Sequence, residues 1–199
     1  MNNKLIKGLF AALMMTSGYL SAETIIEYIK GKDLKEELSD AGWQKIADVY
    51  TTLTPNDLTN DGLMSHGFFF MNSKDLYGIE GFTNYPKAKE YFEAIQARLG
   101  NGDDKNLNNI GASYWLGILY HDGKPGVDKN PVAAFNLLKR VADAQHAAPS
   151  LQQDALKKVA DMYRTGTGVD KNEKRAEEYE RRAAEYFGAK AQVAPAQVK

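Results

Sequence analysis

The chain has 199 residues, no cysteine, and nearly equal numbers of basic and acidic residues, 25 and 26. The absence of cysteine excludes disulfides, thiolate metal ligands and a cysteine nucleophile. The formal net charge of -1 offers no electrostatic footprint for nucleic acid or for an anionic membrane surface.

The first 22 residues have the pattern of a secretory signal peptide. Lys4 and Lys7 precede a short apolar run, and the small pair Ser21-Ala22 precedes Glu23. The run is shorter than the roughly 18 to 20 apolar residues of a membrane span, which favours a cleaved leader over an anchor. Cleavage would leave 23 basic and 26 acidic residues, a net charge of -3, and no integral membrane segment. The signal peptide predicts export, and a chain without cysteine is ordinary among exported bacterial proteins. We therefore expect a periplasmic or secreted bacterial protein.

Residues 23–58 are predicted to form an N-terminal helical segment. The stretch from Thr24 to Leu38 is amphipathic, and a second helical face runs from Gly42 to Tyr50. Turn-forming residues around Pro55 are expected to end this segment.

Downstream, one helical pattern recurs three times, with small residues at its first and third positions and an aromatic residue at its fourth. Small residues allow neighbouring helices to approach closely, and the aromatic ring fills the space between them. The copies are Gly62, His66, Gly67 and Phe70; Ala112, Leu116, Gly117 and Tyr120; and Ala155, Val159, Ala160 and Tyr163.

A second pattern follows each copy of the first and marks another buried helical stripe. Its copies are Ala88, Tyr91, Phe92 and Ile95; Ala134, Leu137, Leu138, Val141 and Ala142; and Ala176, Tyr179, Ala183 and Ala184. We therefore predict three helix-turn-helix units at about 59–100, 108–148 and 150–188, which together form a solenoid over 59–188. Residues 189–199 are expected to be a disordered tail.

The word Val-Asp-Lys-Asn occurs at Val127–Asn130 and again at Val169–Asn172, each time after a glycine-rich turn. Self-similarity at this period is typical of a solenoid. Its asparagine or aspartate can cap the second helix of a unit, and its valine can fill the turn.

The run Ala112-x-x-x-Leu116-Gly117-x-x-Tyr120-x-x-Gly123, followed by Gly126-Val127-Asp128 and the helix around Ala134, resembles the Sel1-like repeat (SLR) family. The last unit is similar, with Ala160 where glycine is usual. The resemblance implies an all-α fold: a short right-handed solenoid of paired antiparallel helices, related to tetratricopeptide repeats, with about three repeats plus N-terminal helices. The family comprises interaction scaffolds, often exported by bacteria. Its cysteine-rich, penicillin-binding members are not matched.

The first unit departs from this pattern. It lacks the glycine-valine turn and has an expanded connection from Asn72 to Asn84. Insertions of this kind often form functional loops. The aromatic residues Tyr77 and Phe82 in this connection are expected either to pin the loop to the unit or to contact a partner.

Signatures of catalysis are absent from the sequence. It contains no nucleophile elbow, phosphate loop or metal-ligand spacing. His66, His121 and His146 lie far apart, and zinc needs three or four converging ligands. We therefore expect no metal, no cofactor and no enzymatic activity.

A binding surface is predicted on the first helix of each unit, because these helices line the concave wall of such solenoids. Side chains about 100° around the helix from the packed stripe should face that wall. They are Met64, Phe68, Met71 and Asn72; Tyr114, Ile118, His121 and Asp122; and Lys157, Asp161, Arg164 and Thr165, joined by Gln44, Asp48 and Thr51 if the helix around Trp43 belongs to the stack.

Two arrangements remain open for the first part of this wall. Met64, Phe68 and Met71 can form the apolar centre of a groove, or they can pack against the N-terminal helices and leave no groove. We expect an exported scaffold that binds another protein, as an immunity or inhibitor protein, an envelope regulator or a factor that engages a host. The alternative is an enzyme acting on a cell-envelope or small-molecule substrate.

Overall fold

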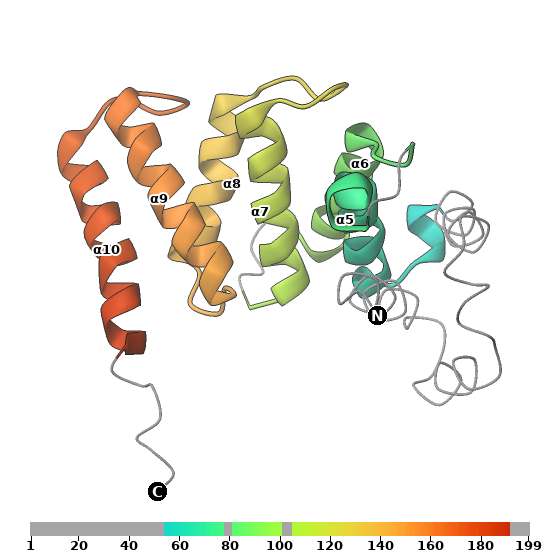
Figure 1. The fold of residues 1–199 in the computed structure, drawn as a ribbon, viewed down its shortest axis with the longest axis horizontal. Helices are drawn as coiled ribbons and strands as arrows, with labels where there is room; N and C mark the ends of the chain where they lie inside the picture. Colours follow the sequence, from blue (N-terminus) through green and yellow to red (C-terminus); the bar gives the residue numbers. More distant parts are fainter. Residues whose placement is uncertain (1–53, 78–80, 101–104, 192–199) are drawn as a thin grey trace, which may run out of the picture. The chain divides into compact units, whose positions relative to one another are not determined.

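A computed structural model describes residues 54–77, 81–100 and 105–191, with the backbone alone at 74–77 and 186–191 (Figure 1). Within these residues the chain forms six α-helices and a 3-10 helix and contains no β-strand apart from an isolated bridge between Lys124 and Val127, which confirms the all-α prediction. The predicted signal peptide, the helices expected between residues 24 and 50, and the tail from 192 lie outside the described residues.

The chain divides into two compact units, Met1–Arg98 and Leu99–Lys199. In the second unit α7 pairs with α8, α9 pairs with α10, and α8 packs against α9 (Figure 1). The described elements are η1 (Pro55–Asp57), α5 (Asn60–Tyr77), α6 (Tyr85–Leu99), α7 (Leu107–Asp122), α8 (Pro131–Asp143), α9 (Pro149–Thr165) and α10 (Glu173–Ala191).

The second helix of each pair begins at an asparagine that makes the same contacts every time. Its side-chain oxygen accepts a hydrogen bond from the backbone N–H three residues later, at 3.0, 3.1 and 3.0 Å for Asn84, Asn130 and Asn172. This bond satisfies an N–H that the helix itself leaves without a partner. The predicted capping role of the repeated word is therefore carried by its asparagine.

The backbone N–H of the same asparagine reaches back to the first helix of its own pair. It donates to the carbonyl oxygen of the aromatic residue that ends the first pattern: Asn84 to Phe70 at 2.7 Å, Asn130 to Tyr120 at 2.9 Å, and Asn172 to Tyr163 at 2.8 Å. Each connection, whatever its length, is thus closed at the same point.

Both sequence patterns mark the core. All four members of the first pattern in α5 are buried, as are Ala88, Tyr91, Phe92 and Ile95 of the second pattern in α6. Tyr120, Leu137 and Tyr163 are only partly buried. Ala184, predicted to be buried, is exposed, because it lies outside the stripe that Ala176, Tyr179 and Ala183 form on α10.

Small residues bring the paired helices together at equivalent positions. A Cβ placed on Gly67 of α5 would lie 2.6 Å from Phe92 Cε1, and one on Gly117 of α7 would lie 2.8 Å from Leu138 Cγ. Both distances are shorter than carbon atoms tolerate, so each large side chain fills the space left by the missing Cβ. Ala160 takes this position in α9 and is fully buried.

Two helices run further than the sequence patterns indicated. α5 continues to Tyr77, so the start of the expanded connection is helical, and Ser73 Oγ lies 2.9 Å from Thr83 Oγ1 across its base. α10 continues to Ala191, past the predicted start of the tail at residue 189, as the high helix propensity of alanine allows.

Replacing Asn130 or Asn172 with alanine should each lower the free energy of unfolding by about 1 kcal/mol, because one helix N–H loses its acceptor. Urea titration followed by circular dichroism measures this change. Asn136→Ala, at an exposed position within α8, is the control and should change stability by less than about 0.5 kcal/mol. Equal effects at all three positions would contradict the capping role.

Gly166 and Gly168 offer a matched test of packing between turns. Both have left-handed backbone, with φ of 76° and 74°. A Cβ on Gly166 meets nothing closer than 3.5 Å, whereas one on Gly168 would lie 2.1 Å from the carbonyl oxygen of Pro131. Gly166→Ala should cost about 1 to 2 kcal/mol from backbone conformation. Gly168→Ala should cost a further 1 to 3 kcal/mol, roughly, because the α8 backbone must move. Equal losses in urea titrations would disprove the close approach.

His66 is a titratable residue at a core position that leucine or valine occupies in α7 and α9. It is 3% exposed, its Nδ1 lies 3.0 Å from the Gly62 carbonyl oxygen, and its ring centroid lies 5.4 Å from that of Tyr91. Burial lowers the pKa of His66 to about 4, against the opposing effect of the hydrogen bond to Gly62. The folded chain therefore disfavours the protonated ring.

The unfolded chain binds a proton at this histidine near pH 6.5, so stability contributed by neutral His66 should be present above pH 6.5 and be lost as the pH falls towards 4. Urea titrations between pH 7 and 5, where ordinary carboxylates remain ionised, should show this fall. His66→Leu should flatten the dependence, and His146→Gln, at an exposed position, is the control for loss of an imidazole. An unchanged slope in His66→Leu would refute the prediction.

Candidate functional site

The candidate surface is most open on α9. Lys157 and Asp161, one turn apart, are both exposed, and Thr165 continues the same stripe. The opposite side of α9 is anchored in the core by Ala155, Leu156, Val159, Ala160 and Met162. Pro149 opens the helix, and Gly166 ends it with an N–H that donates to the carbonyl of Met162 at 2.9 Å. The stripe is therefore a polar face on a well-anchored helix.

Arg164, predicted to belong to the same stripe, is engaged with α10. Its Nη2 lies 2.8 Å from Glu180 Oε1, its Nε donates to Glu173 Oε1 at 3.2 Å, and its Nη1 lies 3.4 Å from Asp161 Oδ1. Hydrogen bonds to Glu180 and Glu173 raise the pKa of the Arg164 guanidinium. A partner that paired with Arg164 would have to compete with these carboxylates.

The positions on α7 that are equivalent to Lys157 and Asp161 are buried. Tyr114 is 8% exposed and Ile118 is 9% exposed, so neither offers the open contact area that the sequence analysis assigned to it. The physical reason at Tyr114 is a contact with the neighbouring repeat: its hydroxyl donates to Asp154 Oδ2 of α9 at 2.8 Å. Burial, together with this hydrogen bond to a carboxylate, raises the pKa of Tyr114. The predicted wall is therefore exposed on α9 and closed at these two positions of α7.

His121, the remaining predicted site residue of α7, is partly exposed at the end of the helix. Its Nδ1 lies 2.9 Å from Asp122 Oδ1, and Lys124 Nζ lies 3.2 Å from the other carboxylate oxygen of Asp122. Burial acts to raise the pKa of Asp122, but hydrogen bonds from His121 and Lys124 outweigh it and lower that pKa. These three residues form a small polar cluster.

In the first unit, the predicted surface residues of α5 differ in exposure. Met64 and Phe68 are partly exposed, whereas Met71 is 8% exposed and belongs to the core. Phe82 is partly buried with its ring centroid 6.2 Å from that of Phe69, a contact that pins the connection to α5. The side chain of Tyr77 lies outside the described residues, as do Gln44, Asp48 and Thr51.

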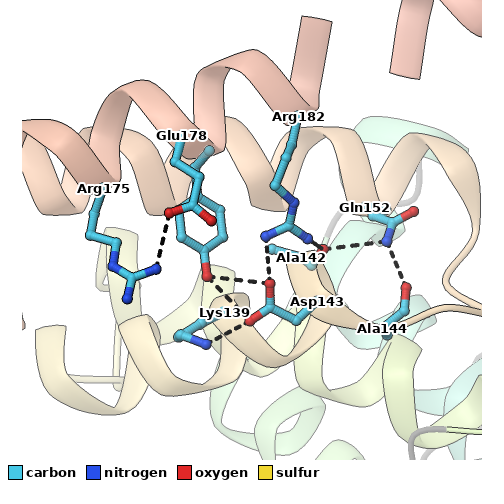
Figure 2. Close-up of polar contacts among 9 residues, drawn as sticks. Lys139, Ala142, Asp143, Ala144, Gln152, Arg175, Glu178 and Arg182 are labelled. Atoms are coloured by element: carbon cyan, nitrogen blue, oxygen red, sulfur yellow. Dashed lines mark hydrogen bonds and ion pairs between the residues drawn. The ribbon is translucent and has the colours of Figure 1, made fainter. Parts of the chain in front are cut away.

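A polar junction that the sequence did not reveal joins the end of α8 to α10 (Figure 2). Asp143 accepts hydrogen bonds from Lys139 at 2.6 Å, from the Tyr179 hydroxyl at 3.2 Å and from Arg182 at 2.7 Å. Burial acts to raise the pKa of Asp143, but hydrogen bonds from Lys139 and Arg182 outweigh it and lower the pKa. The carboxylate therefore remains charged and joins the two helices.

The same junction satisfies backbone carbonyls where α8 ends. Arg182 Nη2 donates to the Ala142 carbonyl at 2.9 Å, and Gln152 Nε2 donates to the carbonyls of Ala142 at 3.3 Å and Ala144 at 2.6 Å (Figure 2). Only the pair Lys139 and Asp143, four residues apart on one helix, was visible as a sequence signal. Arg182 and Gln152 come from other helices. The junction therefore connects α8, α9 and α10.

Two further kinds of site are absent from the described residues. No three histidine, aspartate or glutamate side chains there are grouped so that they could hold a metal ion. No helix in the same part of the chain has the length and apolar character needed to cross a membrane.

The family model for the Sel1 repeat matches residues 75–94, 110–146 and 153–185. The second and third segments contain most of the pairs α7–α8 and α9–α10, and the first contains the end of α5 and the start of α6. The search of curated proteins found no match.

Among solved structures, the chain is similar to the crystal structure of a Sel1 repeat protein from Oxalobacter formigenes. The TM-score is 0.50 at 23% sequence identity, and the match covers 76% of this chain and 53% of that chain. This chain thus spans about half the length of that protein, and the likeness shows the fold.

Sel1 repeats generally mediate protein–protein interaction, which suggests protein partners for this chain. The repeated helix pairs, the family match and the structural neighbour together confirm the resemblance found in the sequence. The chain is a helical repeat protein of the Sel1-like repeat family.

Proposed function

We propose that the chain is an exported scaffold that binds another protein, and that the exposed stripe Lys157, Asp161 and Thr165 on α9 is part of the contact surface. One observation carries this assignment. Lys157 and Asp161 of α9 are exposed, whereas Tyr114 and Ile118, at the equivalent positions of α7, are buried. A partner can reach the α9 stripe without unfolding the repeat.

The chemistry of this stripe suits recognition by charge. Lys157 and Asp161 carry opposite charges one turn apart, and their backbone is held by a helix whose other side is buried. Charges of both signs on a rigid element favour one register of a partner over others and speed its encounter. The burial of Tyr114 and Ile118 shifts the proposed contacts away from an apolar groove on α7 and towards these polar side chains.

The signal-peptide pattern of residues 1–22 supports binding outside the cytoplasm. A basic start, a short apolar run and a small-residue exit at Ser21-Ala22 direct export, so the partner is a protein met in the periplasm or outside the cell. Within this proposal the chain acts as an immunity or inhibitor protein or as an envelope regulator, because each role needs only a stable surface that captures one protein.

A charge exchange on α9 tests the contact surface. The double variant Lys157→Asp with Asp161→Lys preserves net charge and alters no buried residue, so its circular dichroism should match that of the unaltered chain. The amount of partner protein that co-isolates with the double variant from the periplasm, quantified by mass spectrometry, should fall by about tenfold or more. A tenfold fall is equivalent to roughly 1.4 kcal/mol of binding free energy.

The matched control exchanges another exposed pair of opposite charges. Arg175 Nη1 and Glu178 Oε2 lie 3.0 Å apart on α10, and Arg175→Glu with Glu178→Arg should leave the co-isolated protein unchanged. Equal retention by both variants would remove the α9 stripe from the contact surface. If no protein co-isolates with the unaltered chain above background, the scaffold proposal itself fails.

Export is tested separately by cell fractionation. Expressed in a Gram-negative host, the chain should appear in the periplasm or medium with Glu23 as its first residue, read by N-terminal sequencing. A variant lacking residues 2–22 should remain in the cytoplasm. Recovery of the full-length chain, starting at Met1, in the cytoplasm alone would overturn the assignment of residues 1–22 as a leader.

A further inference from the structure

We draw no further inference here: the strongest candidate, the exposed carboxylate cluster of Asp161, Glu173 and Glu180 between α9 and α10, is bonded to Arg164, and no second observation in the described structure points to a ligand for it.

Discussion

In the part of the chain that the structure describes, each of the three helix pairs depends on one asparagine, which joins the end of the first helix to the start of the second. Asn84, Asn130 and Asn172 each donate a backbone N–H to the carbonyl of an aromatic residue on the preceding helix and cap the following helix with the side chain. Because both bonds end at one residue, the connection before it can vary without changing how the helices pair. The longer α5 and its expanded connection are accommodated in this way.

Small residues then set how closely the helices pack. Gly67 and Gly117 accept the side chains of Phe92 and Leu138, and the turn at Gly168 lies against the backbone of Pro131. Such contacts leave no freedom to rotate a helix about its axis, so the orientation of its outer face is determined as well. The exposure of Lys157 and Asp161 follows from the burial of Val159 and Ala160 on the same helix.

Much of the architecture was predictable because it depends on local periodicity. The patterns around Gly117 and Leu138 identified buried helical stripes, and the repeated word located an asparagine cap. Asn84 performs the same role in the first unit but was not recognised, because the word around it is missing there. The α9 surface was predicted at Lys157 and Asp161, whereas Tyr114 and Ile118 of α7 proved to be buried.

The sequence by itself determined the all-α class, the family and the helix faces that enter the core, because each follows from residue type and spacing along a single helix. Only the tertiary structure decided which of the remaining faces are open, because that depends on contacts between residues distant in the chain. Tyr114 donates a hydrogen bond to Asp154, and Asp143 accepts hydrogen bonds from Tyr179 and Arg182. Helical periodicity predicts the face of the helix on which a side chain lies. Packing against another helix decides whether solvent or a partner can reach that side chain.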